Sequence, residues 1–452
     1  MAAKIPTLSA SAVAELTSLL EEYTAFPKPR LPGTFLTVSS TNPNAPLFLD
    51  AKGSRNATAD FTDDPRGPVT PKTLLYIASC TKSIVAISLL LLMQEGKIKS
   101  LDESVDPYIP QMKANGVLNT KTGEIEPVHK DKDITIRMLM DHTSGSTYPF
   151  KEASLHAWAE KKGQPSAFSL TKAAFVDLPL LFQPGEGWSY GFGLDWAVLL
   201  IEKLLGDGTT FAQFAQKRIF DPLGMKKSTF TPRDLVASTA AAEGVPDDAK
   251  AMYASKHGME IHWREEDGSL VPVTKQYPRP AGAIWEGEGA AAPDVASGGA
   301  GLVSTIEDYG RYLSFLIALS KFPASSAEAE KLSIPSSVFI DPSISRQLFT
   351  PHLSDAQIPG LVRTLEDEGV VAPKGGYANL QHTSGLAYLP KGTEAGVTQG
   401  SVFWSGITCL FYIVDPTKEI AVMLATQILP YADPMWKELL YKCVKVIYGG
   451  LE

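Results

Sequence analysis

Ser79 and Lys82 are spaced so that they could form an activated nucleophile. They begin and end the tetrapeptide Ser79-Cys-Thr-Lys82, and because residues three apart on a helix share a face, the lysine amine can reach the serine hydroxyl. At a helix N-terminus, free N–H groups and the helix dipole favour developing negative charge. Burial there lowers the pKa of Lys82, which is the direction that activates a serine. The alternative is an N-cap serine followed by a solvent-facing lysine.

The segment after Ser79 favours the buried arrangement. It predicts the strongest helix of the sequence, from about Ser79 to Glu95, followed by Gly96, which is suited to the left-handed cap that ends a helix. Residues 84–92 are apolar almost without interruption, which is typical of a helix buried on all sides. Such a helix would hold Ser79 rigidly.

Two further patterns are similar to catalytic motifs. Gly187-Trp-Ser-Tyr-Gly191 matches the nucleophile elbow Gly-x-Ser-x-Gly, which needs a strand before it and a helix after it. The preceding Gln183-Pro-Gly-Glu186 indicates a turn instead, so Ser189 stays as an alternative nucleophile behind Ser79. Lys121-Thr-Gly123 matches a Lys-Thr-Gly box, which belongs on a strand that lines an active site late in the chain. Here it lies in a polar stretch and is interpreted as a turn.

The elements that must position these residues are strands near both ends of the chain and helices between them. Short strands are predicted near the two ends, at 34–38, 47–49, 401–404, 408–414 and 420–426. Apolar periodicity predicts helices at 9–23, 134–142, 171–176, 194–205, 211–219, 306–319 and 435–448. Residues 240–300 show little periodicity, apart from one hairpin predicted at 260–273.

This distribution predicts an α+β fold. We expect residues 1–100 and 335–452 to form one domain, an antiparallel sheet flanked by helices. Residues 101–334 are expected to form an inserted, mainly helical domain. Because sites often lie where two such domains meet, we expect the active site between them.

The composition excludes several functional classes. Of the 452 residues, 44% are hydrophobic and 20% charged, which is typical of a globular protein. A net charge of −9 without a dense Lys/Arg run argues against a nucleic-acid partner. Three scattered cysteines predict neither a disulfide framework nor a zinc site, and the seven histidines show no metal-ligand spacing. With no signal-peptide pattern and no apolar run long enough for a membrane span, we expect a cytoplasmic protein.

Taken in order, three motifs resemble a known family. They are Ser79-Cys-Thr-Lys82, Leu139-Met-Asp-His-Thr-Ser-Gly145 and Pro184-Gly-Glu-Gly-Trp-Ser-Tyr190. The series resembles the serine β-lactamase-like family, which includes class C β-lactamases, DD-peptidases and their esterase relatives. Tyr190-Gly-Phe-Gly-Leu-Asp-Trp196 and Gly400-Ser-Val-Phe-Trp-Ser-Gly406 look like the fungal branch that contains the lovastatin acyltransferase and lovastatin esterases. The resemblance covers about residues 30–430 and implies a β-lactamase-like sheet with a helical domain.

The resemblance implies a catalytic set of Ser79, Lys82 and Tyr190. Ser79 is the expected nucleophile, with Lys82 within hydrogen-bond reach of both Ser79 and Tyr190. Tyr190 is the expected general base, which later returns the proton to the leaving alcohol. Since a free tyrosine has a pKa of about 10, the positive charge of Lys82 and the helix dipole must lower it. The alternative for Tyr190 is a core tyrosine with a satisfied hydroxyl.

The resemblance also implies an oxyanion hole and substrate contacts. The backbone N–H of Ser79 is one expected donor, and Gly406 or Ile407 supplies the other. Trp404 stands where β-lactamases carry the lysine or histidine of a late Lys-Thr-Gly box. Tyr148 is expected near the acyl group, with a buried packing tyrosine as the alternative. His142 is expected to be structural.

Two departures from the family pattern bear on the substrate. The Tyr-x-Asn box is Tyr190-Gly-Phe192 here, so the asparagine that contacts a β-lactam is missing. The late Lys-Thr-Gly is missing too, and with it the cation that meets a substrate carboxylate. Both departures favour a neutral, apolar ester. Phe150, Trp188 and Phe192 would suit an apolar pocket, although aromatic residues beside a core can also be packing.

We therefore expect a serine esterase that cleaves a neutral apolar ester, of the kind found in polyketide secondary metabolites, through a Ser79 acyl-enzyme. The alternative is an acyltransferase that passes the acyl group to an alcohol, because the two reactions differ only in whether water or alcohol attacks. An α/β-hydrolase using Ser189 and a non-catalytic family member remain further alternatives. No metal or other cofactor is expected, and the sequence sets no oligomeric state.

Overall fold

The computed structural model describes residues 5–57, 67–243, 258–273, 294–368 and 380–452. No helix within these ranges is both long and apolar enough to cross a membrane. The expected cytoplasmic location stays a prediction. Cys80, Cys409 and Cys443 are buried free thiols.

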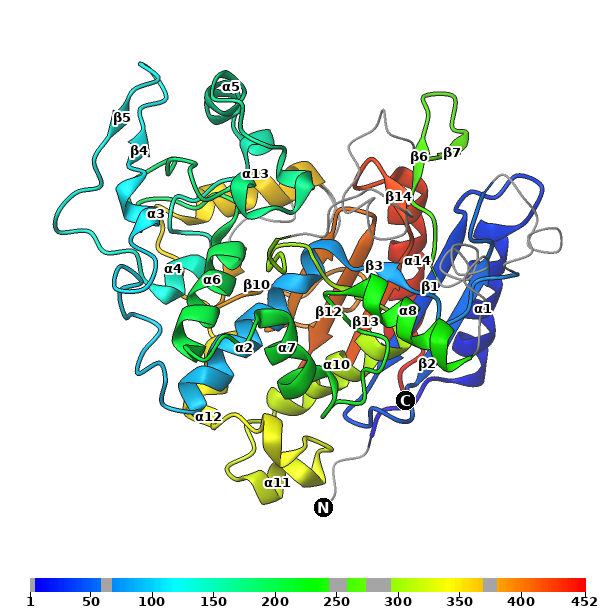
Figure 1. Ribbon diagram of the computed structural model, residues 1–452. Helices are drawn as coiled ribbons and strands as arrows, with labels where there is room; N and C mark the ends of the chain where they lie inside the picture. The colour runs from blue at the N-terminus through cyan, green and yellow to red at the C-terminus, as the bar shows by residue number, and fades with distance from the viewer. Residues whose placement is uncertain (1–4, 58–66, 244–257, 274–293, 369–379) are drawn as a thin grey trace.

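A seven-stranded antiparallel sheet forms the centre of the molecule (Figure 1). Its order is β2-β1-β13-β12-β11-β10-β9. The strands are β1 (Gly33–Ser39), β2 (Phe48–Gly53), β9 (Gln381–His382), β10 (Ala387–Tyr388), β11 (Val402–Gly406), β12 (Leu410–Asp415) and β13 (Ile420–Ala425). The two ends of the chain meet where β1 pairs with β13, with Phe35 opposite Ala425. Every residue of β1, β12 and β13 is buried, because helices cover both faces.

Two pairs of helices enclose the sheet. Figure 1 shows α1 (Ala10–Thr24) and α14 (Pro434–Gly449) on one side, with α2 (Lys82–Gln94) and α10 (Ile306–Leu319) on the other. α10 packs against β1, β12 and β13. Although α10 falls within residues 101–334, which we assigned to the helical domain, it therefore covers the sheet. The domain boundaries themselves stay a prediction.

The remaining helices and small sheets lie around this central sheet and its four covering helices. The helices are α3 (Gln111–Ala114), α4 (Ile136–Met140), α5 (Ala153–Lys161), α6 (Gly193–Leu205), α7 (Phe211–Ala215), α8 (Pro232–Ala242), α11 (Ser326–Lys331), α12 (Pro342–Ser345) and α13 (Ile358–Glu368). Small sheets pair β3 (Leu75–Tyr76) with β8 (Val303–Ser304), β4 (Val117–Leu118) with β5 (Ile125–Glu126), and β6 (His262–Arg264) with β7 (Leu270–Pro272) and β14 (Ile428–Leu429). α6 packs against both α2 and α4. The hairpin predicted at 260–273 is β6–β7, whereas much of 240–300 lies outside the described residues.

Three predicted helices differ from the structure. The helix expected from Ser79 begins as α2 only at Lys82, after a 3₁₀ turn, η1, at Ala78–Thr81. The hydroxyl of Thr81 donates to the carbonyl of Ala78 at 2.6 Å, a local side-chain bond that competes with the regular helical ladder. The helix expected at 171–176 is a single 3₁₀ turn, η4, at Lys172–Ala174, and α7 ends early in a π-helical turn, η5, at Gln216–Phe220.

Candidate active site

Ser79 lies in a turn whose conformation is fixed from several sides. The preceding residue, Ala78, has a left-handed φ of 50°, a conformation that costs energy for a residue other than glycine. Tyr309 of α10 donates its hydroxyl to the carbonyl of Cys80 at 2.9 Å. Together with the Thr81–Ala78 bond, this contact holds the turn against α10. Ser79 is therefore presented by a strained and well-braced segment, as a nucleophile needs.

Lys82 lies beneath Ser79 and is almost completely buried, with 1% of its surface exposed. Its ammonium group donates to the Ser79 hydroxyl at 3.2 Å, the Tyr148 hydroxyl at 3.1 Å and the Gly299 carbonyl at 2.8 Å. These three acceptors match the three protons of an ammonium group. The contact between Ser79 and Lys82 that the spacing predicts is present.

Burial sets the charge of Lys82. Loss of hydration lowers its pKa to about 7, and the negative charge of Asp195 acts in the opposite direction. The ammonium and amine forms are then both populated near neutral pH. A lysine in this state can exchange a proton with its neighbours during a reaction.

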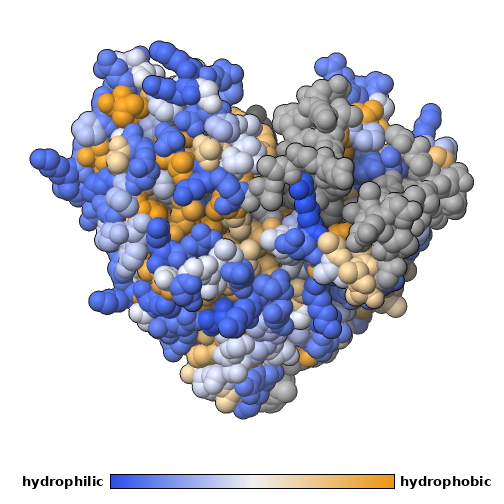
Figure 2. Space-filling view, viewed as in Figure 1, coloured by the Kyte–Doolittle hydropathy of each residue, from blue (hydrophilic) through white to orange (hydrophobic). Residues whose placement is uncertain are grey.

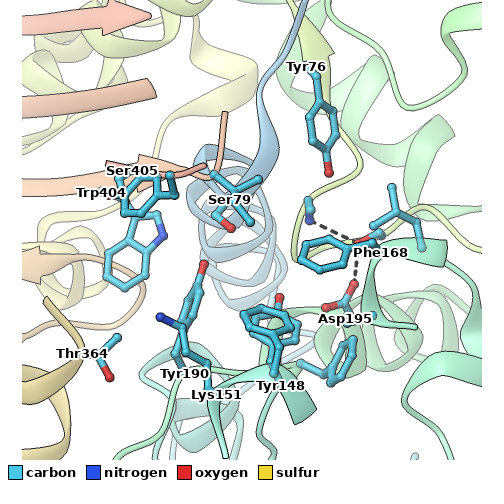
Figure 3. A pocket seen from close by; sticks show the side chains of 18 of the residues that line it. Tyr76, Ser79, Tyr148, Lys151, Phe168, Tyr190, Asp195, Thr364, Trp404 and Ser405 are labelled. Carbon is cyan, nitrogen blue, oxygen red and sulfur yellow. Dashed lines mark hydrogen bonds between the residues drawn. The ribbon is translucent and has the colours of Figure 1, made fainter. Parts of the chain in front are cut away.

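Two tyrosines lie beside Lys82, and the structure distinguishes them. Figure 3 shows the hydroxyl of Tyr190 pointing toward Ser79. The Lys82 ammonium lies 4.5 Å from the ring centroid of Tyr190, so its cation faces the ring, whereas it donates directly to the hydroxyl of Tyr148. Burial raises the pKa of Tyr148 well above 10, so Tyr148 keeps its proton at neutral pH.

The ring of Tyr190 is supported by other buried rings. His142 lies 4.9 Å and Trp404 5.5 Å from it between ring centroids, and Trp188 stacks on it at 6.4 Å. His382 contacts His142 at 5.8 Å, and sequence reasoning gave no signal for it. Burial lowers the pKa of His142 well below 6.5 and that of His382 to about 4. Both imidazoles are therefore neutral at pH 7, which fits the structural role expected for His142.

Ser79 opens into a cavity of about 140 Å³ (Figure 3). Aromatic and aliphatic side chains dominate its wall, which is lined by Tyr76, Ser79, Tyr148, Phe150, Lys151, Ala167, Phe168, Leu170, Tyr190, Phe192, Asp195, Ser297, Ala300, Thr364, Leu365, Trp404, Ser405, Ile407 and Tyr431. Most of the face in Figure 2 is hydrophilic, with apolar side chains gathered in the left part of the view, around α4 and α6 of Figure 1. The mainly apolar lining of the cavity suits an apolar substrate with a few polar contacts.

The predicted substrate contacts reach this cavity, with one exception. Phe150, Phe192, Tyr148 and Trp404 line it, and Phe150 stands at its mouth with 45% of its surface exposed. Trp188 is outside the lining, because its indole is buried behind Tyr190. The prediction of Trp188 as a substrate contact therefore differs from the structure, in which it is a support for Tyr190.

One cation in the cavity wall was missed by the sequence reasoning. Lys151 lines the cavity together with Thr364 of α13, and Figure 3 shows its side chain beside Tyr190. The sequence suggested that no cation would meet a substrate carboxylate, because the late Lys-Thr-Gly box is missing. The only signal for Lys151 was its place directly after Phe150.

Strand β11 approaches the Ser79 turn closely at Gly406. A Cβ atom at Gly406 would lie 2.9 Å from the carbonyl oxygen of Ile77 and 3.3 Å from the Cβ of Ala78. Only glycine allows this approach without displacement of the backbone. Ser405 and Ile407, on either side of it, line the cavity with Ser79. The backbone at 405–407 is therefore beside the nucleophile, where the resemblance placed the second oxyanion donor.

The two other sequence patterns that are similar to catalytic motifs do not form catalytic structures. Ser189 follows no strand, α6 begins only at Gly193, and the Ser189 N–H donates to the carbonyl of His142 at 3.1 Å. Ser189 is also outside the cavity lining, so the local structure is not a nucleophile elbow. Lys121-Thr-Gly123 forms the turn between β4 and β5, with Gly123 at a φ of 77°.

Asp195 and Ser297 are functional candidates that sequence reasoning missed. Asp195 is buried in the first turn of α6, and both residues line the cavity. They are joined by a 2.6 Å hydrogen bond across 102 residues of chain. No group of three or more potential metal ligands was found in the part of the chain that the structure describes.

Comparisons with known proteins show which family the chain matches. The β-lactamase family model matches residues 48–439. A lovastatin esterase of Penicillium rubens is 39% identical over 163 residues, which are 35% of this chain and 40% of the esterase. The ML-236A carboxylate methylbutanoyltransferase of Penicillium citrinum is 25% identical over 99% of this chain and 98% of its own length.

The fold agrees with these matches. The unliganded simvastatin synthase of Aspergillus terreus superposes with a TM-score of 0.75 at 22% identity, covering 98% of this chain and 99% of that one. The β-lactamase-like fold and the fungal esterase and acyltransferase relatives indicated by the sequence motifs are thus confirmed. Because the family model spans most of the chain, the protein belongs to the β-lactamase family.

Proposed function

We propose that the protein is a serine esterase that cleaves neutral, apolar carboxylic esters through an acyl-enzyme on Ser79. The observation that carries the proposal is the hydrogen bond from the buried Lys82 to Ser79, at the base of a mainly apolar cavity. The relatives named as a lovastatin esterase and as methylbutanoyltransferases support the same chemistry. We further propose a polyketide-like secondary metabolite as the class of substrate.

In the proposed acylation step, Tyr190 accepts the proton of Ser79 while the serine oxygen attacks the ester carbonyl. The negative oxygen of the tetrahedral intermediate accepts hydrogen bonds from the N–H of Ser79 and from the N–H of Gly406 or Ile407. As the ester C–O bond breaks, Tyr190 returns the proton to the departing alcohol. Water then attacks the acyl carbonyl while Tyr190 accepts its proton, and Tyr190 returns that proton to the Ser79 oxygen as the bond between Ser79 and the acyl group breaks and the acid leaves.

In this scheme the protonation state of Lys82 governs that of Tyr190. The two groups form a coupled pair that must lose one proton before it can accept the proton of Ser79. A pKa of about 7 for Lys82 makes that singly protonated pair available near neutral pH. Tyr148, whose pKa is raised by burial, keeps its proton and orients the ammonium group.

Transfer of the acyl group to an alcohol is the second candidate. The observation that favours it is the match to a methylbutanoyltransferase over 99% of this chain. Hydrolysis requires no site for a second substrate, whereas transfer requires the alcohol to displace water from the cavity. Product analysis with a chromogenic butanoate ester, with and without added alcohol, distinguishes the two: esterase predicts free acid in both mixtures, and transferase predicts a new ester.

A fluorophosphonate probe tests the nucleophile. We expect label on the Ser79 peptide, absent in Ser79→Ala and strongly slowed in Tyr190→Phe. Ser189→Ala is the matched control and should label normally. Label on Ser189 would instead support an α/β-hydrolase mechanism, and a folded protein that takes no label would be a non-catalytic family member.

A further inference from the structure

Asp195 is a buried carboxylate beside the reactive groups that the proposed mechanism does not use. It lies in the first turn of α6 and is 4% exposed. Its Oδ1 accepts a hydrogen bond from the Ser297 hydroxyl at 2.6 Å (Figure 3). The same oxygen accepts from the Gly299 N–H at 3.1 Å. Within the described residues its Oδ2 has no hydrogen-bond partner. A buried charge in this state is costly, so a compensating charge is expected nearby.

The turn that Asp195 holds is the one that contacts Lys82. The Ser297 hydroxyl also accepts from the Ala300 N–H at 3.2 Å, which closes the turn. The carbonyl of Gly299 in that turn accepts the shortest of the three hydrogen bonds of Lys82, at 2.8 Å. Asp195 is thus connected to the catalytic ammonium through a single residue.

Gly299 is packed so tightly that the connection tolerates no side chain. An added Cβ would lie 2.4 Å from Oδ2 of Asp195 and 2.6 Å from the hydroxyl of Tyr148. Both distances are shorter than any normal contact. The carboxylate, the turn and the Tyr148 hydroxyl that Lys82 also bonds therefore form one close-packed unit.

We propose that Asp195 is the positioning residue and counter-charge of Lys82. It fixes the Ser297–Ala300 turn so that the Gly299 carbonyl orients the ammonium toward Ser79, and its negative charge stabilises the ammonium in a buried site. This inference rests on the proposed function, since it assigns a role within the same catalytic unit. Asp195 acts through Lys82 and touches no reacting atom.

The other groups that face Lys82 are uncharged near neutral pH. Burial raises the pKa of Tyr76, Cys80 and Tyr148 and lowers that of His142. Tyr190 is the partner of Lys82 in the proposed mechanism. Burial raises the pKa of Asp195 and lowers that of Lys82, and in each case the charge of the other group is the largest opposing influence, so each favours the charged form of its partner.

The pH dependence of kcat/KM for a chromogenic butanoate ester tests the counter-charge in the full-length protein. Asp195→Asn keeps the shape and the Ser297 bond but removes the negative charge, so the pKa of Lys82 falls. Because the active pair forms as its first proton leaves, the acid limb should then move to lower pH by about one unit or more. A folded Asp195→Asn protein with the wild-type acid limb would overturn the counter-charge.

Ser297→Ala separates positioning from charge. It keeps the carboxylate but loosens the turn, so we expect kcat about tenfold lower with an acid limb close to that of the wild type. Wild-type kcat in Ser297→Ala would overturn the positioning role, and this result does not depend on whether Asp195→Asn folds.

Asp308 provides the matched control. It is also 4% exposed, lies in the first turn of α10 and accepts from a serine hydroxyl, that of Ser228, at 3.2 Å. Asp308→Asn should lower stability without moving the acid limb, and an equal shift in this variant would contradict the inference. Fluorophosphonate label confined to Ser79 in every variant, at whatever rate, would show that the proposed function stands even if Asp195 has no such role.

Discussion

The base and the mouth of the cavity are built on different principles. At the base, Lys82 is almost completely buried, and each hydrogen bond of its ammonium group has a defined acceptor. At the mouth, Phe150 is partly exposed and stacks on Phe168 at 5.2 Å, with Leu365 of α13 in the same wall. The base depends on direction and charge, whereas the mouth depends on apolar area.

This difference separates reactivity from substrate choice. A buried, hydrogen-bonded charge responds sharply to small displacements, so changes at the base should lower kcat. Apolar contacts bind ground state and transition state alike, so changes at the mouth should raise KM with kcat nearly unchanged. Each prediction below tests whether that division holds.

The largest effect is expected for Lys82→Met. The variant removes the cation at the base, so kcat/KM should fall about 1,000-fold, and Tm should fall because Asp195 loses its counter-charge. Steady-state kinetics and thermal unfolding measure the two effects. Lys161→Met, at an exposed position, is the control and should change neither. A Lys82→Met enzyme with near-normal kcat would mean that Lys82 takes no part in the mechanism.

Next in size is the contrast between the two tyrosines. Tyr190→Phe should lower kcat about 100-fold or more because it removes the general base, whereas Tyr148→Phe removes one hydrogen bond to Lys82 and should cost about tenfold. Single-turnover acylation rates measure both. The reverse order would make Tyr148 the base and contradict the assignment drawn from its raised pKa.

The pH profile gives an intermediate effect. Since the pKa of Lys82 is lowered to about 7, kcat/KM should be low in acid, where the pair is fully protonated, and should rise through about pH 7. The rate of fluorophosphonate labelling of Ser79 should follow the same curve. A rate that is flat from pH 6 to pH 8 would mean that Lys82 does not titrate in the reaction.

The smallest effects are expected at the mouth. Leu365→Ala should raise KM for long acyl esters about three- to tenfold, by loss of apolar contact, and should leave kcat nearly unchanged. Lys151→Met should leave KM for a neutral ester unchanged and raise it for an ester that carries a carboxylate. If either variant mainly lowers kcat, reactivity and substrate choice are not separated between the bottom and the mouth of the cavity.

Local sequence signals predicted part of this arrangement well. The predicted helices at 194–205 and 306–319 agree with α6 and α10, because apolar periodicity and capping are local properties. The reach of Lys82 to Ser79 followed from spacing alone, even though the turn between them is 3₁₀ and α2 begins three residues later than expected.

The features that were missed depend on contacts between distant segments. Asp195 and Ser297 meet across 102 residues, and His382 reaches the rings around Tyr190 from strand β9. Trp188 was placed in the substrate pocket because it adjoins the motif, but the fold turns it behind Tyr190. No local pattern records which side of a loop faces the cavity.

Trapping the acyl-enzyme tests the central claim most directly. The protein is mixed with a chromogenic butanoate ester, quenched in acid during turnover, digested and analysed by mass spectrometry. We predict one butanoyl group on the peptide that carries Ser79, and none in Ser79→Ala. A butanoyl group on Ser189, or turnover without any acylated peptide, would contradict the mechanism.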